Sequence, residues 1–270
     1  MPHHTPENGT THPPLSGVRV LVTRPRHQAL KMCERLAGLG AEVLVQAAIE
    51  IAPPDDWGPL DAALSRLGEF DWLVFSSTNG VSFLIERLRS LNESTRMPAG
   101  LKLAAIGPGT AEELQRFGLN ADFVPREYRA EALADGLAGE ARAGDGRGRR
   151  FLLARASRGR QVLRQRLAAD GAIVEEVVVY ESRDISPHDP DVIKVAAELD
   201  AGRIDWVTVT SSAIARSIAG LFGDKLGRAR LASISPITSD VLRELGFEPA
   251  AEAGEYSVEG VVQAIVGCEV

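Results

Sequence analysis

The sequence predicts a two-domain α/β protein in which parallel sheets are covered by helices. A chain of 270 residues is long for one hydrophobic core and sufficient for two. Short apolar runs alternate with amphipathic stretches, which is typical of the strand–helix units that build parallel sheets. The phrase DWLVFSSTNG at 71–80 also recurs as DWVTVTSSAI at 205–214, 134 positions later (205 − 71). These three observations indicate two related α/β halves.

The repetition extends well beyond this phrase. LKLAAIGPGTAEELQRFGL resembles ARLASISPITSDVLRELGF, and VRVLVTRP resembles RFLLARAS. The matching segments are 18–25 with 150–157, 40–51 with 171–182, 71–80 with 205–214, and 101–119 with 229–247. Each copy is far longer than the repeat of a solenoid protein. The pattern therefore predicts a duplicated, domain-sized unit.

The elements of the first copy can be assigned in chain order. A valine-rich run at 18–22, between Gly17 and Pro25, suits a strand that is buried on both faces. We expect strands at 18–22, 43–51, 73–75, 103–106 and 121–124, and helices at 27–39, 60–67, 81–91, 111–117 and 130–141. Composition alone would place a domain boundary in the Gly/Arg-rich loop at 143–150.

Charge and composition exclude several classes of protein. The formal charge of −7 argues against non-specific binding to nucleic acid, and no apolar run approaches the length of a membrane span. The two cysteines have no metal-binding spacing, so we expect a reducing, cytoplasmic environment. Residues 1–16 lack a signal-peptide core and are rich in Pro, His and Thr, so we expect a disordered tail.

Polar residues follow the predicted strands at the points where helices begin, which is where parallel α/β sheets bind ligands. We expect Ser77 and Ser211 to cap two helices, and Thr110 and Thr238 to cap two more after proline turns. Gly109 would let a ligand approach the backbone. Helix N-termini attract anions. Ordinary capping explains one such turn equally well, but four turns favour a polyanion site if the two sheets face each other.

Motifs of the common catalytic classes are missing from the sequence. It contains no phosphate-binding GxxxxGK[ST] loop, no GxGxxG after a strand, no GxSxG elbow, no HExxH and no DxDxDG. Any chemistry must therefore rely on binding and polarising a reactive substrate.

The ordered set VLVTRP, DWLVFSSTNGV, AAIGPGTAEEL, VVVYESR, DWVTVTSS and ISPITSDVL resembles the uroporphyrinogen-III synthase family from about residue 18 to 266. The resemblance implies two flavodoxin-like parallel-sheet domains that are joined by a two-stranded β-ladder, with the ligand cleft between them. The implied domain 1 is discontinuous and the implied domain 2 is continuous, which replaces the boundary at 143–150. Their expected ranges are 17–48 with 184–270 for domain 1, 52–180 for domain 2, and 43–51 and 173–183 for the linkers.

The resemblance also implies a reaction. The family cyclises hydroxymethylbilane with inversion of ring D, and so makes uroporphyrinogen III for tetrapyrrole (heme) biosynthesis. It acts as a lyase that uses no cofactor and no metal. Tyr180, in VVVYESR, matches the family's tyrosine at the cleft and is expected to protonate the departing hydroxyl. The implied partner is a linear tetrapyrrole, without nucleic acid or membrane, and we expect a monomer.

The same resemblance assigns substrate binding to the turns after the strands. We expect the substrate carboxylates to contact Ser77, Thr78, Gly109, Thr110, Ser211, Ser212, Thr238, Arg24 and Arg155. The two arginines are chosen because a guanidinium binds a carboxylate through two hydrogen bonds, although either could equally be a surface charge. Ser235 and Ser239 replace the family's usual Gly and Ala, a departure that could reshape that turn.

Two other functions remain open at this level. The first is a non-catalytic two-domain sensor of a tetrapyrrole or another polycarboxylate, which the presence of Tyr180 weakly opposes. The second is a flavodoxin-like nucleotide or flavin protein, which no phosphate-loop motif supports.

Overall fold

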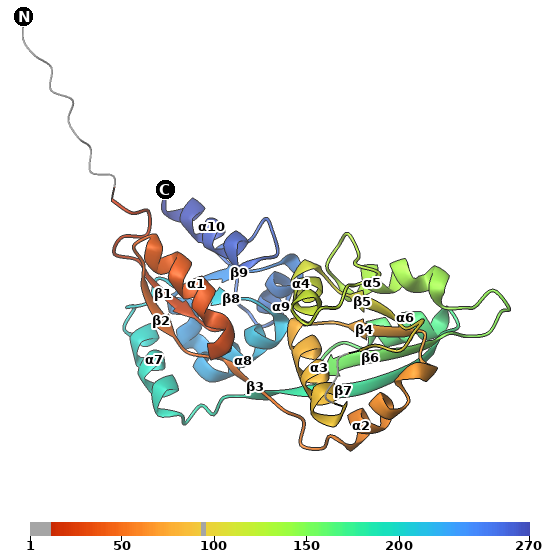
Figure 1. Cartoon of the computed structure of the whole chain (residues 1–270). Coiled ribbons are helices and arrows are strands. Elements are labelled where there is room, and N and C mark those ends of the chain that lie inside the picture. The colour runs from red at the N-terminus through yellow and green to blue at the C-terminus, as the bar shows by residue number, and fades with distance from the viewer. Residues whose placement is uncertain (1–11, 93–95) are drawn as a thin grey trace, which may run out of the picture. The chain divides into compact units, whose positions relative to one another are not determined.

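The computed structural model describes residues 12–92 and 96–270 (Figure 1). It divides into two compact units, and each unit contains one five-stranded sheet. Unit 1 comprises the described residues up to Glu50 together with Arg183–Val270, and unit 2 comprises Ile51–Ser182. Both sheets are built on parallel pairing, so the predicted fold class is confirmed.

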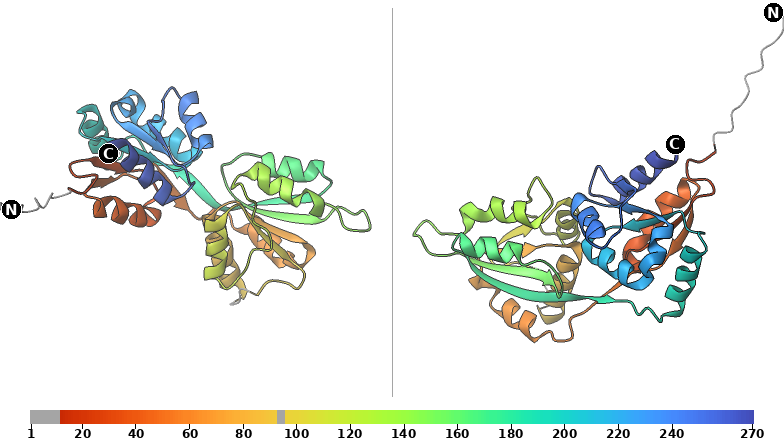
Figure 2. Two further views of the ribbon diagram at one scale, coloured as in Figure 1. Left: turned by 90° about the horizontal axis from the view of Figure 1, so that it is seen from above. Right: turned by 180° about the vertical axis from the view of Figure 1, so that it is seen from behind.

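The sheet of unit 1 has the strand order β10-β9-β8-β1-β2. Its strands are β1 (Arg19–Val22), β2 (Glu42–Val45), β8 (Trp206–Val209), β9 (Arg230–Ser233) and β10 (Ala251–Glu252). Its α-helices are α1 (Arg26–Gly38), α7 (Pro190–Asp200), α8 (Ser212–Phe222), α9 (Pro236–Glu244) and α10 (Val258–Glu269). Helices α1 and α10 lie together on one face of the sheet, and α7, α8 and α9 lie on the other (Figure 2).

The sheet of unit 2 has the strand order β3-β7-β6-β4-β5. Its strands are β3 (Ile49–Ala52), β4 (Trp72–Phe75), β5 (Lys102–Ala105), β6 (Arg150–Ala156) and β7 (Ile173–Asp184). Its α-helices are α2 (Gly58–Ser65), α3 (Thr78–Asn92), α4 (Pro108–Arg116), α5 (Ala130–Leu137) and α6 (Val162–Ala169). Strands β3 and β7 are neighbours, and the chain passes from one unit to the other within these two strands.

The two units repeat one topology. Strand β8 lies between β1 and β9 in unit 1, as β4 lies between β6 and β5 in unit 2. Helices α5 and α6 share one hydrophobic cluster of unit 2, whereas α2, α3 and α4 share the other. Unit 1 separates α1 and α10 from α8 and α9 in the same way. The internal repeat read from the sequence therefore corresponds to a repeat in space.

The repeated Asp-Trp dipeptide stands at the start of β4 in unit 2 and of β8 in unit 1, which are equivalent places. The Asp205 carboxylate accepts a hydrogen bond of 2.7 Å from the Arg19 backbone N–H, and Asp71 accepts one of 2.8 Å from Arg150. Both acids thus bind the first residue of the neighbouring parallel strand. Trp72 and Trp206 follow them into the core. This half of the repeated phrase lies at the amino ends of the strands and serves the fold.

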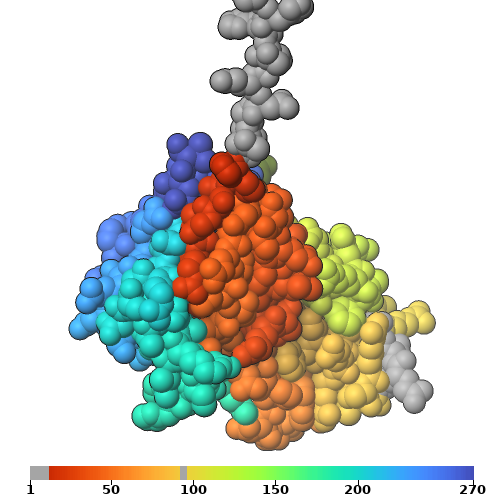
Figure 3. All heavy atoms as spheres, turned by 90° about the vertical axis from the view of Figure 1, so that its left-hand side faces the viewer, coloured from red at the N-terminus to blue at the C-terminus, as the bar shows by residue number. Residues whose placement is uncertain are grey.

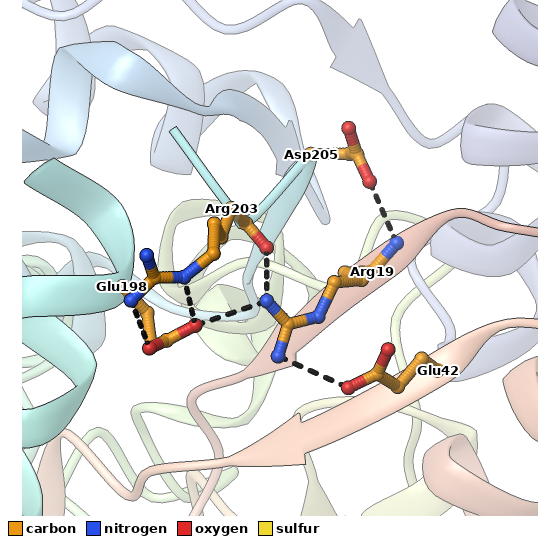
Figure 4. Close-up of polar contacts among 5 residues, drawn as sticks. All are labelled: Arg19, Glu42, Glu198, Arg203 and Asp205. Carbon is orange, nitrogen blue, oxygen red and sulfur yellow. Dashed lines mark hydrogen bonds and ion pairs between the residues drawn. The ribbon is translucent and has the colours of Figure 1, made fainter. Parts of the chain in front are cut away.

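Arg19 belongs to a network of charged groups at that end of unit 1 (Figure 4). Its guanidinium bonds the Glu198 carboxylate at 3.0 Å and the Arg203 carbonyl at 2.7 Å, and it pairs with Glu42 at 3.0 Å. Arg203 binds Glu198 in turn at 2.8 Å through Nε. These contacts join β1, β2 and the end of α7.

The strand expected at 43–51 is wrong as a single element. Residues 42–45 form β2 at the edge of the first sheet, and residues 49–52 form β3 in the second sheet. Between them, the Gln46 and Ala48 backbone N–H groups bond back to Val22 and Thr23. The chain leaves the first sheet here, and the short side chains of Ala47 and Ala48 do not favour strand continuation.

Three other expectations are corrected. The strand at 121–124 is reduced to one bridge between Ala104 and Phe123. The helix at 130–141 stops at Leu137 and continues as a 3₁₀ turn, Ala138–Glu140. The disordered tail was expected to reach Ser16, but Leu15 is fully buried and its N–H bonds the Leu39 carbonyl at 2.9 Å. The remainder of that tail, residues 1–11, lies outside the described residues.

No helix within 12–92 or 96–270 is both long enough and apolar enough to cross a membrane.

Candidate functional site

The predicted site residues gather at two places, one in each unit, where parallel strands end and helices begin. The Tyr180 edge is the carboxyl end of β4, β5 and β7 in unit 2. The Arg24 edge is the carboxyl end of β1, β8 and β9 in unit 1. Because β4 pairs with β5, and β8 with β9, the two turns within each edge are neighbours.

Tyr180 is the central group of the Tyr180 edge. Strand β7 carries it, its side chain is 8 % exposed, and its ring stacks on Phe83 with the centroids 5.8 Å apart. Its hydroxyl lies 3.1 Å from Ser77 Oγ. Ser77 Oγ also accepts the Gly80 backbone N–H at 3.0 Å, so it caps α3 as expected. The structure thus joins the predicted catalytic residue to a predicted binding residue.

Burial raises the pKa of the Tyr180 phenol above its ordinary value, and the hydrogen bonds with Ser77 and Asn79 offset this shift in part. Low-dielectric surroundings disfavour the phenolate, which explains the direction. Tyr180 is therefore a neutral hydroxyl at physiological pH, and it has a proton to donate.

The second turn of this edge presents open backbone. A Cβ placed on Gly109 would meet no atom within 4 Å, so a ligand can approach its backbone closely. Thr110 is 5 % exposed and is the third residue of α4. Ser82 and Glu113 connect this turn to the previous one through a bond of 2.7 Å between α3 and α4. Thr78 lies beside Ser77 as the first residue of α3.

The Arg24 edge repeats these two turns. Ser211 Oγ accepts the Ile214 N–H at 3.2 Å and caps α8, whose first residue is Ser212. Ser235 caps α9 by accepting the Thr238 N–H. No tyrosine is found at the place in β2 that would match Tyr180, because β2 ends at Val45. Both edges have helix N-termini capped by serine, and at the Tyr180 edge the capping Ser77 Oγ also meets a phenol.

The capping role expected for Thr110 and Thr238 is wrong. Pro108 and Pro236 occupy the first turn of each helix, which places the caps at Gly107 and Ser235. Each threonine is then the third helical residue, and both are buried. The backbone N–H groups of both threonines are bonded within their own turns. That of Thr110 donates to the Gly107 carbonyl at 3.1 Å.

The departure at Ser235 does not reshape the turn. Gly107 has φ −171° and ψ 177°, and Ser235 has φ −164° and ψ 160°, so both are extended. Ser239 is fully buried and its Oγ lies 2.6 Å from Ser233 Oγ. Both serines therefore fit the same backbone that the first copy uses.

Comparison with known proteins assigns the family. A match to the family described as "Uroporphyrinogen-III synthase HemD" covers residues 31–263. A uroporphyrinogen-III synthase from Synechococcus elongatus is 35 % identical over 262 residues, which are 93 % of this chain and 96 % of that protein. This chain belongs to the uroporphyrinogen-III synthase family. The family is one of enzymes, and the resemblance read from the sequence is confirmed.

More distant members of the uroporphyrinogen-III synthase family agree in length and fold. The Escherichia coli uroporphyrinogen-III synthase is 25 % identical, with 91 % of this chain and 99 % of that protein covered. A solved Thermus thermophilus uroporphyrinogen III synthase superposes with a TM-score of 0.67 at 19 % identity, covering 92 % of this chain and 97 % of that chain. The Helicobacter pylori structure gives 0.60 at 18 % identity, covering 93 % and 99 %. These structures support the fold.

The two candidate arginines differ in their surroundings. Arg155 bonds Glu176 Oε1 at 3.0 Å, with further bonds to the Ala156 and Gly159 carbonyls. Arg24 bonds Gln28 Oε1 at 3.3 Å, and burial lowers the pKa of its guanidinium. Arg155 is thus engaged within its own unit, which makes Arg24 the better candidate for a ligand carboxylate.

Sequence reasoning missed some polar groups at these edges. Asn79 lies in the SSTN turn and interacts with Tyr180, and the quoted phrase already contained it. Gln46 is 4 % exposed, and its Oε1 has no partner among the described residues. Gln46 follows an edge strand whose end was not recognised, so only the structure could reveal it.

Among the described residues, no group of His, Cys, Asp and Glu could hold a metal ion.

Proposed function

We propose that this chain cyclises hydroxymethylbilane with inversion of ring D and releases uroporphyrinogen III. The observation that carries the proposal is the Tyr180 hydroxyl, held 3.1 Å from Ser77 Oγ at the carboxyl edge of a parallel sheet. Family membership supplies the reaction class, and this contact supplies a proton donor where such sheets bind ligands.

The chemistry needs little beyond positioning and a proton. The substrate carries its own leaving group, the hydroxyl of the ring A hydroxymethyl group. Tyr180 donates its proton as the carbon–oxygen bond breaks, so that water leaves and a positively charged azafulvenium forms beside the Tyr180 phenolate. The substituted carbon of ring D then attacks this electrophile, and rearrangement through a spiro intermediate inverts ring D. The proton that the pyrrole carbon loses when the ring closes restores the neutral phenol. A pocket that holds the two carbons together provides the selectivity.

Carboxylate binding is assigned to the helix N-termini of both edges. Each helix N-terminus contributes about 0.3–1 kcal/mol to the free energy of binding an anion. A micromolar affinity requires about 8 kcal/mol. The N-termini at Ser77, Gly109, Ser211 and Ser235 therefore orient the carboxylates, whereas burial of the tetrapyrrole framework supplies most of the free energy. Ser212, Thr78 and the buried threonines Thr110 and Thr238 complete the same turns.

An isomer analysis tests the reaction. The purified protein is given freshly generated hydroxymethylbilane, the products are oxidised, and the uroporphyrin isomers are separated by chromatography. A dominant type III isomer is expected. Type I alone, which forms by spontaneous closure, would contradict the proposal and favour a non-catalytic sensor of tetrapyrroles.

We further propose that the enzyme is a cytoplasmic monomer that does not bind nucleic acid. Free thiols at Cys33 and Cys268 agree with a reducing compartment, and the net charge of −7 disfavours nucleic acid. Light scattering after size-exclusion chromatography should give the mass of one chain, 28.9 kDa. A mass twice as large would exclude the monomer.

A further inference from the structure

Arg24 and Arg155 occupy the same place in the two units. Val20 of β1 pairs with Trp206, and Phe151 of β6 pairs with Trp72. The two tryptophans start the repeated strands, so Val20 and Phe151 are equivalent. Each arginine follows four residues later (24 − 20 = 4 and 155 − 151 = 4). Both side chains therefore leave the sheet at the carboxyl end of equivalent strands.

In unit 2 this arginine has an internal counter-charge. Arg155 Nη1 donates to Glu176 Oε1 at 3.0 Å, and the two side chains are 16 % and 20 % exposed. Its other nitrogens bond the carbonyls of Ala156 and Gly159 at 3.1 and 3.3 Å. Glu176 pairs with Leu153, two residues before Arg155. The acid on the neighbouring strand thus neutralises the arginine.

In unit 1 the acid is replaced by valine. Val22, two residues before Arg24, pairs with Val45, so Val45 stands where Glu176 stands in unit 2. Within the part of the chain that the structure describes, Arg24 Nε is buried without a hydrogen-bond partner, and no carboxylate pairs with this guanidinium. A guanidinium that is partly withdrawn from water without a counter-charge carries a desolvation cost. Its position is therefore better explained by a ligand than by the fold.

We propose that Arg24 binds a carboxylate of the tetrapyrrole, in the place that Glu176 fills in unit 2. This assignment rests on the proposed function, since it requires a polycarboxylate ligand at the Arg24 edge. The guanidinium binds through a bidentate, charge-assisted pair, which Lys cannot reproduce. The valine at position 45 keeps the arginine free of an internal acid, so Val45 acts as a positioning residue for binding.

The side chain at position 45 can be changed without disturbing the core. Val45 is 36 % exposed at the sheet edge. It lines a surface depression of about 350 Å³ together with Leu44, Gln46 and Lys194. Figure 3 shows this side of unit 1, with the red and orange chain of residues 12–50 beside the cyan segment around α7. A longer side chain has room here.

The test compares Val45→Glu with Val45→Gln. The first supplies the missing acid, and the second adds the same size without charge. We expect Val45→Glu to weaken the binding of reduced uroporphyrinogen III about 10- to 100-fold, as loss of a hydrogen-bonded charge pair does. Val45→Gln should change the affinity by less than about threefold. Equal weakening by both variants would overturn the proposal, because size and not charge would then be responsible.

Arg24 variants separate binding from folding. Arg24→Gln and Arg24→Lys should both lose affinity for uroporphyrinogen III, while Arg24→Gln keeps the parent melting temperature because the half-buried, uncompensated charge is removed. A parent-like affinity, or a lower melting temperature with unchanged binding, would overturn the proposal and give Arg24 a structural role. Failure of the proposed reaction can be told apart from failure of the Arg24 assignment. If the parent forms only the type I isomer, the proposed reaction is wrong, but the affinities of the four variants still decide the role of Arg24.

Discussion

The Asp205 carboxylate receives the backbone N–H of Arg19 at 2.7 Å, and Asp71 receives that of Arg150 at 2.8 Å. Each acid fixes the start of a neighbouring parallel strand. Because Asp205 is partly buried, Asp205→Ala should lower the free energy of unfolding by about 1.5–3 kcal/mol. The exposed Asp71 should contribute less, about 0.5–1.5 kcal/mol. Urea denaturation measures both values.

Asparagine at position 205 is the matched control. Its amide oxygen still accepts the N–H but lacks the charge, so Asp205→Asn should cost roughly half as much as Asp205→Ala. If Asp205→Ala leaves the unfolding midpoint unchanged, then the carboxylate is not holding β1, and the repeated dipeptide needs another explanation.

The Glu198 network predicts a pH dependence of stability. Hydrogen bonds from Arg203 and Arg19 lower the pKa of Glu198 to about 2 from an ordinary 4.5. A folded-state pKa below the unfolded one means that the contribution is complete above pH 4.5 and is lost as the pH falls toward about 2. Glu198→Gln should therefore be less stable than the parent at pH 7, and the two proteins should converge near pH 2.

Unfolding free energies measured between pH 7 and pH 2 test this convergence. Glu112→Gln, on an exposed helix position, should run parallel to the parent throughout. A constant difference between Glu198→Gln and the parent across the whole range would exclude titration of Glu198 as the cause.

Much of this fold was predictable because each strand obeys a local rule. The apolar run that ends in Val22 is buried on both faces, and Gly40 closes α1 with φ +91°, as the glycine there suggests. The break between β2 and β3 was not predictable in this way. Residues 43–51 are apolar except for Gln46 and Glu50, and the two strands belong to different sheets, a tertiary choice that periodicity does not encode.

The site was predictable as a set of positions and less so as a set of roles. Ser77 and Ser211 cap as their place before a helix suggests. Thr110 and Thr238 do not, because a proline two residues earlier moves the cap upstream. The difference between Arg24 and Arg155 depends on Val45 and Glu176, which lie on neighbouring strands. Such cross-strand partners are invisible until the register is known.

Replacing Ser235 by glycine, the residue at the equivalent position 107, should have little effect on turnover or stability. Gly107 already takes the same extended backbone conformation, and glycine in place of a capping serine costs only a few tenths of a kcal/mol. Ser235→Gly should therefore keep the parent turnover and unfolding midpoint, whereas Ser235→Ala should cost about 1 kcal/mol. Turnover that falls with Ser235→Gly would show instead that the hydroxyl contacts the substrate.

Ser77 and Ser211 form a matched pair that separates capping from catalysis. Both hydroxyls cap a helix, but only Ser77 Oγ also meets a phenol. Alanine at either position should lower the free energy of unfolding by about 1 kcal/mol. Only Ser77→Ala should also lower kcat, because it removes the partner that orients the Tyr180 hydroxyl. Equal losses of kcat in both variants would remove that orienting role.

Tyr180→Phe is the decisive change at the site. Phenylalanine keeps the ring that stacks on Phe83 and removes the hydroxyl that contacts Ser77 Oγ. Loss of a general acid should lower kcat roughly 10²- to 10⁴-fold, with little change in affinity for uroporphyrinogen III. Because burial holds the pKa of Tyr180 above its ordinary value of 10, turnover of the parent should not decline through loss of this proton until the pH exceeds 10.

Tyr256→Phe, at an exposed tyrosine, is the control and should leave kcat unchanged. Equal effects of Tyr180→Phe on kcat and on product affinity would assign the hydroxyl to binding rather than to proton transfer.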